Sequence, residues 1–237
     1  MPTLFSSRAV LAAVCLAAFT LPAAAARKAR AIFIQPPEPV AEKATLFTGT
    51  VYAEIELPQR NLSPEVDLPD GDLTLVVLPG KLAPDAKVPE GAPKFIIPAA
   101  WSRCILLFFP DPSNKVFPAR VIPVNASTEN FPNGDTLIYN VSTAAIMGKF
   151  GTQVVKVMPG KSSIVKPPIS GFGDYEVAID CAFPDDTKPT AVCRSTWQHD
   201  PDVRQILFVT PPTPGYKVPR VWGILDRQKK DEDKKQN

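Results

Sequence analysis

Apolar and polar residues alternate in short runs along most of this chain, and a period of two indicates β-strands rather than helices. The longest run is Thr45–Leu57, in which Ile55 shares a face with other apolar residues and Glu54 lies on the opposite face. That pattern is typical of an antiparallel strand with one buried face. Cys104–Phe109 is apolar at every position, which predicts a buried central strand or one that faces apolar layers on both sides.

The stretch Asp135–Lys166 shows the strand pattern most clearly. It predicts short strands at Thr136–Val141, Gln153–Val157 and Ser162–Val165, and the pair Pro159-Gly160 predicts a tight turn between the last two. Its apolar residues do not recur at intervals of three and four, so nothing in it favours a helix. We therefore expect an all-β protein.

Similar runs predict strands in the rest of the chain, at Ala31–Gln35, Leu73–Leu78, Val116–Val124, Tyr175–Phe183, Thr190–Trp197, Gln205–Val209 and Arg220–Leu225. The chain has 28 prolines and only 12 glycines, which suits short strands bounded by turns and edges that prolines protect from pairing. Residues 227–237 are charged and polar throughout, which predicts a disordered tail.

The two halves of the chain contain similar passages. Arg103–Pro110 resembles Arg204–Pro211, and each leads into a proline-rich turn. Two upstream pairs follow in the same order: Thr45–Phe47 with Thr136–Ile138, and Val66–Gly71 with Val155–Gly160. This order predicts an internal duplication, with two Ig-like antiparallel β-sandwich units at 27–125 and 126–226. The alternatives are a chance likeness between strand–turn–strand passages, and one large interlocked sandwich.

The first 26 residues have the pattern of a signal peptide. Arg8 precedes a short apolar run at Ala9–Phe19, and the small residues Ala23–Ala26 precede a basic patch at Arg27–Arg30. The apolar run is shorter than the roughly 20 residues that span a bilayer, so we expect cleavage after Ala26 rather than a retained anchor. The mature chain is then expected to be periplasmic or extracellular, without a transmembrane segment.

Three cysteines lie beyond the expected cleavage point. Cys181 and Cys193 flank a turn-rich loop centred on Thr187, so a hairpin would bring them together across two strands. An oxidising compartment would allow a disulfide between them, and the alternative is that all three are buried thiols. Cys104 lies inside an apolar run and is expected to be a free thiol in the core.

No catalytic, cofactor-binding or metal-binding residue can be assigned from the pattern. His199 is the only histidine, and it stands before Asp200-Pro201, which favours a simple turn. The chain contains no G-x-S-x-G motif to present a nucleophile to a histidine. Asp67, Asp70 and Asp72 surround a glycine, as calcium ligands can, but their spacing is not that of an EF-hand and suits a solvated turn.

Charge and aromatic residues narrow the choice of partners. The net charge is only +2, so no basic field favours nucleic acid. Trp101, Trp197 and Trp222 could form a platform for a glycan, but each adjoins a predicted strand and is expected to pack in the core. An envelope protein or a glycan is the expected partner, and the oligomeric state is left open.

The segments Asn140–Ser142, Gly148–Gly151, Met158–Gly160 and Pro219–Gly223 carry one resemblance. In them the chain resembles uncharacterised exported bacterial β-sandwich proteins. The resemblance implies a β protein of the cell envelope and implies no catalytic residue.

Three functions are compatible with these observations. The leading hypothesis is a non-enzymatic binding or structural module of the cell envelope. The second is an envelope hydrolase that acts on glycan or peptide through carboxylates or His199. The third is an assembly subunit that pairs through the edges of its sheets.

Overall fold

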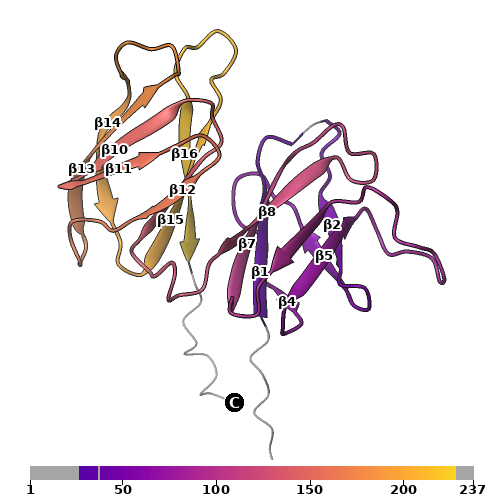
Figure 1. The fold of residues 1–237 in the computed structure, drawn as a ribbon. Helices are drawn as coiled ribbons and strands as arrows, with labels where there is room; N and C mark the ends of the chain where they lie inside the picture. Colours follow the sequence, from indigo (N-terminus) through magenta and orange to yellow (C-terminus); the bar gives the residue numbers. More distant parts are fainter. Residues whose placement is uncertain (1–26, 37, 228–237) are drawn as a thin grey trace, which may run out of the picture.

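The computed structural model describes residues 27–36 and 38–227, which contain sixteen β-strands and no helix (Figure 1). The first unit consists of β1 (Arg27–Phe33), β2 (Lys43–Phe47), β3 (Tyr52–Glu56), β4 (Val66–Leu68), β5 (Leu73–Leu78), β6 (Lys94–Ile97), β7 (Arg103–Pro110) and β8 (Ala119–Asn125). The second unit consists of β9 (Thr136–Asn140), β10 (Ala145–Phe150), β11 (Gln153–Val157), β12 (Ser162–Val165), β13 (Gly173–Ala182), β14 (Thr190–His199), β15 (Val203–Thr210) and β16 (Arg220–Arg227).

The predicted signal peptide, at 1–26, and the predicted tail beyond Arg227 lie outside the described residues. Within the described part of the chain, no helix is long and apolar enough to cross a membrane.

Each unit is a sandwich of two four-stranded sheets, so the prediction of an all-β protein with two sandwich units is confirmed. The first unit has the strand orders β4-β1-β7-β8 and β3-β2-β5-β6, and the second has β12-β9-β15-β16 and β11-β10-β13-β14. The second pair of orders is the first pair with eight added to every strand number. The prediction that both units are antiparallel was wrong for one strand pair in each unit. β1 runs parallel to β7, and β9 runs parallel to β15. These partners are separated along the chain by strands of the opposite sheet, so no hairpin forces them to run in opposite directions.

The strand order supports one part of the predicted repeat and corrects the rest. Arg103–Pro110 and Arg204–Thr210 lie in β7 and β15, which occupy the same place in their units. Thr45–Phe47 lies in β2, whereas Thr136–Ile138 lies in β9, which is the counterpart of β1. In the other upstream pair, Val66–Gly71 begins in β4, whereas Val155–Gly160 begins in β11, and the counterpart of β4 is β12. Short β-branched runs resemble one another on any strand, so these two matches were wrong.

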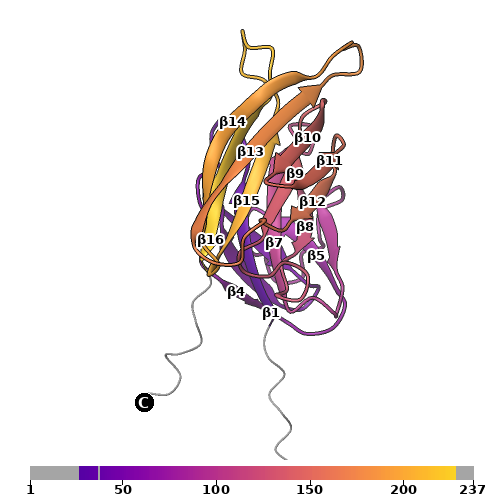
Figure 2. The same cartoon turned by 90° about the vertical axis from the view of Figure 1, so that its left-hand side faces the viewer.

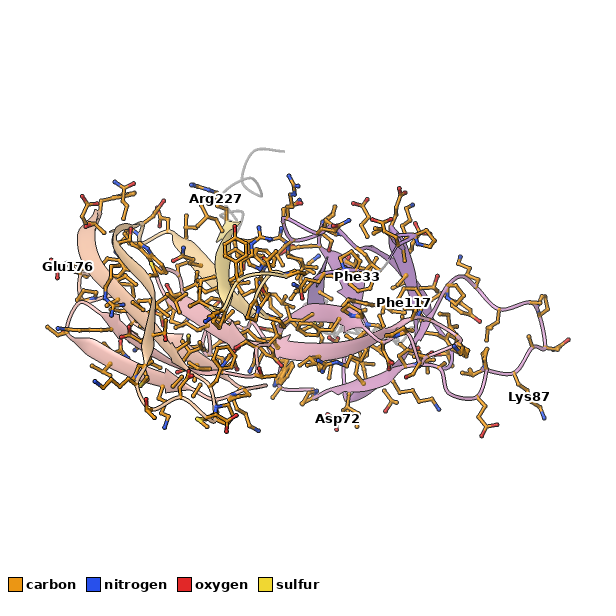
Figure 3. The ribbon with its side chains drawn as sticks, turned by 90° about the horizontal axis from the view of Figure 1, so that it is seen from above. Phe33, Asp72, Lys87, Phe117, Glu176 and Arg227 are labelled. Atoms are coloured by element: carbon orange, nitrogen blue, oxygen red, sulfur yellow. The ribbon has the colours of Figure 1, made fainter. Side chains whose placement is uncertain are left out.

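The four sheets stack as layers, and a hydrophobic core fills each of the three spaces between them. The inner sheets, which contain β1 and β9, face each other across the junction of the units (Figures 1 and 2). We call the core between them the interunit core: Ile32, Ile34, Leu62, Ile105, Leu107, Phe109, Ala126, Phe131, Leu137, Tyr139, Ile206, Phe208 and Ile224. Seen from above, side chains fill the molecule from the outer face that carries Glu176, past Phe33 and Phe117 in the first core, to the loop that carries Lys87 (Figure 3).

Strand β7 shows why the two units behave as one body. Leu106 and Phe108 point into the core of the first unit, while Ile105 and Leu107 point into the interunit core. All four side chains are at most 2% exposed. The prediction that Cys104–Phe109 faces apolar layers on both sides is therefore confirmed.

The last strand is longer than predicted. β16 continues past Leu225 to Arg227, and Asp226 is only 1% exposed. The sequence pattern did not predict this extension, because Asp226 is charged and charged residues usually face solvent. In the structure the Asp226 side chain points inward. Its carboxylate is paired with arginines, as a buried charge requires.

Candidate functional site

A groove opens on the surface where β8 of the first unit meets β12 of the second. It has a volume of about 510 Å³. Its apolar lining comes from both units, namely Ile122, Pro123 and Val124 on β8, Leu137 and Tyr139 on β9, and Ile164 on β12. β8 and β12 belong to the two inner sheets, which face each other across the junction of the sandwiches (Figures 1 and 2). We call this feature the interunit groove.

The floor of the interunit groove is continuous with the interunit core. Leu137 and Tyr139 belong to both, and the Tyr139 ring stacks on Phe109 with 5.9 Å between ring centroids. The Arg120 guanidinium lies 4.9 Å from the centre of the Phe109 ring, on the first unit. Burial raises the pKa of Tyr139, and the charge of Arg120 opposes this shift. The floor is thus built from packed side chains whose positions are fixed by the core.

The two walls of the interunit groove are sheet edges. Among the residues that the structure describes, β8 pairs only with β7 and β12 pairs only with β9, so each is the terminal strand of its sheet. A terminal strand presents unpaired backbone N–H and C=O groups, which an added extended segment can bond. Pro123 removes one N–H from β8, so β12 is the better edge for such pairing.

The rim of the interunit groove is polar. Asn125, Asn130 and Ser162 lie on it, and Lys161 is the only charged side chain among the lining residues. Asn130 is held in place, because its Nδ2 donates to the carbonyl oxygen of Asn125 at 2.9 Å. A hydrophobic floor within a polar, basic rim is suited to binding a segment that carries both an apolar side chain and a negative charge.

His199 lies at one end of the second sandwich and is 6% exposed. Its Nδ1 is 2.7 Å from the carbonyl oxygen of Gly171, and a carbonyl only accepts, so Nδ1 must carry the hydrogen. Nε2 faces Gly134, where a Cβ atom would lie 2.9 Å from it. No hydrogen bond in the described part of the chain joins this ring to a serine, threonine or cysteine side chain.

A pocket of about 140 Å³ adjoins His199 and is also lined by Tyr175. Asp135 lies in the sequence between Gly134 and Thr136, which also line the pocket. It is 7% exposed and has an Oδ2 atom without a hydrogen-bond partner among the described residues. Burial raises the pKa of Asp135 and of Tyr175. Burial is the largest cause of both pKa shifts; Lys166 and His199 oppose the shift of Asp135, and Thr136 opposes that of Tyr175. The hydrolase hypothesis stays a prediction.

The acidic residues around Gly71 make structural contacts instead of converging on one point. Asp67 pairs with Lys28, and Asp72 Oδ1 accepts a hydrogen bond from the backbone N–H of Ala99 at 2.7 Å. Across residues 27–36 and 38–227, no group of three or more His, Cys, Asp or Glu side chains is placed to hold a metal ion.

The predicted disulfide between Cys181 and Cys193 is not formed, and these residues and Cys104 are free thiols in the structure. The hairpin does form, but its register places Cys181 opposite Thr190 and Cys193 opposite Ile179. A register shift after Ile179 contributes to this offset. Cys104 is a buried thiol, as predicted, and burial raises its pKa to about 12.

The three tryptophans are in different places and form no common platform. Trp197 packs edge-on against Phe150, with 5.7 Å between ring centroids, in the second unit. Trp222 packs on Phe208 at 4.8 Å, next to the interunit core. Trp101 packs against the core of the first unit. Each is a packing residue, as the sequence predicted.

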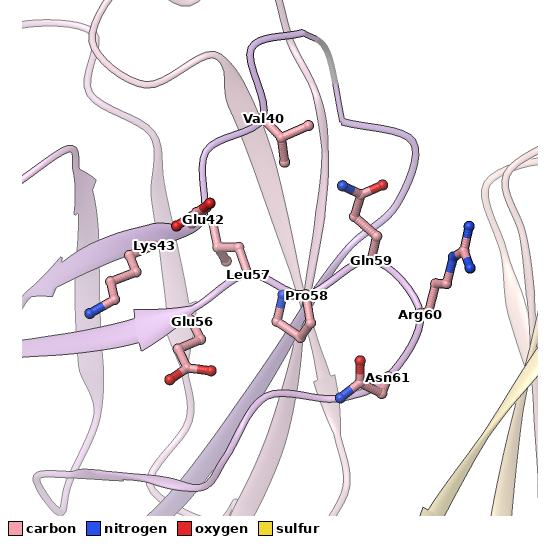
Figure 4. A pocket seen from close by; sticks show the side chains of 9 residues that line it. All are labelled: Val40, Glu42, Lys43, Glu56, Leu57, Pro58, Gln59, Arg60 and Asn61. Carbon is pink, nitrogen blue, oxygen red and sulfur yellow. The ribbon is translucent and has the colours of Figure 1, made fainter.

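A wider depression of about 690 Å³ lies on the first unit, but its charged groups do not converge (Figure 4). Its lining includes Glu42, Lys43, Glu56 and Arg60. Figure 4 shows Lys43 and Arg60 at opposite ends of the depression. Lys43 is instead paired with Glu54 at 2.8 Å, outside the lining. This arrangement offers no concentrated chemistry for a ligand.

Sequence reasoning missed the interunit groove entirely. Ile122, Val124 and Ile164 were assigned to predicted strands, but nothing local says that two edge strands from different units lie together. The visible clue was a strand with two apolar faces, because such a strand must be covered on both sides. No protein-family model matches this chain, and no curated protein matches it. The resemblance to exported bacterial β-sandwich proteins therefore stays a prediction.

Proposed function

We propose that this chain is an exported, non-enzymatic binding module of the cell envelope that holds a partner in the interunit groove. The observation that carries the proposal is the groove itself, which combines a packed apolar floor with two free sheet edges. Export is supported by the signal-peptide pattern of the first 26 residues. The compartment is then the periplasm or the cell exterior.

A rigid junction supports this function. Asp226 of the second unit accepts a hydrogen bond from Arg30 of the first at 2.6 Å, and Arg204 binds the same carboxylate. Because the units are fixed against each other, the groove is formed before a partner arrives. A preformed site avoids much of the entropy cost of ordering on binding.

The test uses two tryptophan variants of the full chain, each expressed in the organism that naturally makes the protein and purified from its cell envelope. Ser162→Trp places a bulky ring in the groove, and Thr196→Trp places the same ring on the exposed face of β14. Native mass spectrometry should show a complex of defined mass with the unaltered chain and with Thr196→Trp, and the free chain with Ser162→Trp. Retention of the same complex by Ser162→Trp, or a free chain in every sample, would overturn the proposal.

A second candidate is an assembly subunit that pairs through β14. This strand has ten residues and, within the described part of the chain, pairs only with β13, so it presents a long edge there. Sedimentation equilibrium over a wide concentration range tests this function. Self-association would support it, and a monomer at the highest concentration would exclude pairing between copies.

We also infer that the two units arose by internal duplication and are Ig-like. The matched strand orders and the matched parallel pairs, β1–β7 and β9–β15, support this inference. The likeness of Arg103–Pro110 to Arg204–Pro211 adds support from the sequence.

A further inference from the structure

The two inner sheets meet through equivalent faces. Ile105 of β7 and Ile206 of β15 occupy matched places in the repeat, and both lie in the interunit core. Their antiparallel partners, Val124 and Ile224, are matched too, and both contact that core. An interface built from the same face of two equivalent units has approximate two-fold symmetry. It therefore has two related flanks, one near β1 and β16 and the other near β9 and β8.

The flank near β1 is closed by the chain itself. Leu62 is 3% exposed and belongs to the interunit core. The next residue, Ser63, donates its backbone N–H to the Ala31 carbonyl at 2.8 Å, and its Oγ accepts the Ala31 N–H at 2.9 Å. Earlier in the same segment, the Pro58 carbonyl accepts the Phe33 N–H at 2.8 Å. Residues 58–63 thus run beside β1 and insert one leucine between the units.

The corresponding positions in the second unit follow from strand pairing. Ala31 is paired with Leu106 in the first inner sheet, and Ile138 is paired with Leu207 in the second. Leu106 and Leu207 are matched in the repeat, since both are the fourth residue of the similar passages. Ala31 and Ile138 are therefore equivalent positions.

The residue that closes the first flank has a small counterpart on the second. Ser63 is hydrogen-bonded to Ala31 in the first unit, and Ser163 is paired with the equivalent residue, Ile138, in the second. The residue before each is Leu62 in one unit and Ser162 in the other. Ser162 is exposed and lies on the rim of the interunit groove.

The identity of one residue explains the difference. Residues 58–63 run beside β1, as β12 runs beside β9, and they bury Leu62 in the interunit core. The matched position on β12 carries the small, exposed Ser162, so the equivalent flank stays open as the interunit groove.

We propose that the interunit groove binds an extended peptide segment of a partner protein, an inference that rests on the proposed function. The segment inserts a leucine-sized aliphatic side chain and carries an acidic residue beside it. The apolar part follows from continuity with the interunit core, which already accepts Leu62 on the related flank. The acidic part follows from charge, because Lys161 is the only charged lining residue, and the exposed Arg120 lies 4.9 Å from the Phe109 ring that stacks on Tyr139 of the floor. The peptide backbone pairs with the free edge of β12.

The probe is a synthetic peptide that copies Pro58–Glu65 with the substitution Arg60→Asp, added to the full chain labelled with ¹⁵N. Amide shifts should change around Val124, Tyr139 and Ser162 and not on the outer sheets. A control peptide with Leu62→Ala should bind at least about tenfold more weakly, because a leucine-sized side chain loses its burial. The peptide with the unchanged Arg60 should bind a few-fold more weakly at low salt.

Protein variants make the site test specific. Ser162→Leu should fill the groove from within and abolish peptide binding, while Thr196→Leu on the exposed face of β14 should bind as the unaltered chain does. Thermal unfolding shows whether each variant keeps its fold. Shifts centred elsewhere, or equal binding of the Leu62→Ala peptide, would overturn this inference.

The failure of this inference can be separated from failure of the proposed function. If the peptide does not bind but Ser162→Trp still releases the envelope partner, the ligand class is wrong and the binding function stands. If the peptide does not bind and Ser162→Trp also leaves the envelope complex intact, both proposals are wrong.

Discussion

Asp226 on β16 accepts a hydrogen bond from Arg30 on β1 across the junction of the two units, with 2.6 Å between Oδ1 and Nη1. The other carboxylate oxygen of Asp226 accepts from Arg204 Nε at 2.9 Å. Arg204 Nη1 also donates to the carbonyl oxygens of Ala126 and Phe131, at 2.7 and 2.9 Å, in the segment that links the units. One buried carboxylate therefore connects both units and their linker.

Asp226→Asn should destabilise the protein strongly. Burial lowers the pKa of Arg204, and the charge of Asp226 opposes that shift, so the variant removes the negative charge that faces this buried cation. Removing one partner of such a pair costs about 3–5 kcal/mol. Urea unfolding measures the change, and Glu54→Gln, which breaks only the exposed pair with Lys43, is the control that should leave the midpoint almost unmoved. A midpoint for Asp226→Asn equal to that of the control would contradict the expectation.

The two flanks of the interunit core should respond in opposite ways to changes in side-chain size. Leu62→Ala removes buried methyl groups and should cost about 2–5 kcal/mol. Ser162→Leu adds apolar contact in an open groove and should stabilise the fold by up to about 1 kcal/mol. Thermal unfolding checks both, with Ile96→Ala as a control because Ile96 is 63% exposed. Stabilities that fall together in both variants would show that the flanks are not equivalent.

Asp135→Asn should change how stability depends on pH. Burial raises the pKa of Asp135 above its ordinary value of 3.8, while Lys166 and His199 oppose this shift. The folded protein then holds the proton more tightly than the unfolded chain, so this group lowers stability as pH rises from 3.8 through the raised value. The variant should be the more stable protein at neutral pH, and the difference should vanish below the ordinary pKa. A difference in the free energy of unfolding between the two proteins that is the same at every pH would contradict this prediction.

The three described cysteines should react with iodoacetamide at different rates. Cys104 and Cys181 are 2% and 0% exposed, and burial raises the pKa of both thiols. Cys193 is partly exposed and should be modified first, by roughly tenfold or more. Peptide mass spectrometry after timed labelling of the folded protein gives the order, and labelling in denaturant should remove the difference. An intact mass two hydrogens short, together with a linked peptide pair that contains Cys181 and Cys193, would instead show that these two residues are bonded.

Local patterns predicted much of the fold because strand periodicity survives in short segments. The unbroken apolar run Cys104–Phe109 lies within one strand, β7, as predicted. This run even indicated a layer on each side of β7, which the interunit core provides. Thr45–Leu57, predicted as one strand, is instead split into β2 and β3, which pair as a hairpin around a turn at 48–51.

The remaining features depend on contacts between distant residues, which periodicity does not encode. The predicted last strand ended at Leu225 and left out Asp226, because the partner that allows this charge to be buried, Arg30, is 196 residues away. The offset of Cys181 from Cys193 depends on a register shift in the hairpin that spacing alone does not show. The interunit groove depends on the difference between Leu62 and Ser162, which has meaning only once the two units are seen face to face.

The approximate two-fold symmetry of the junction has a consequence for stoichiometry. Two identical subunits around a true axis would have both flanks sealed or both flanks open, and would bind two segments or none. Because both units lie in one covalent chain, residues 57–65 can seal one flank while the other stays available. The chain should therefore saturate at one bound segment per molecule, which gives the partner a single orientation along the junction.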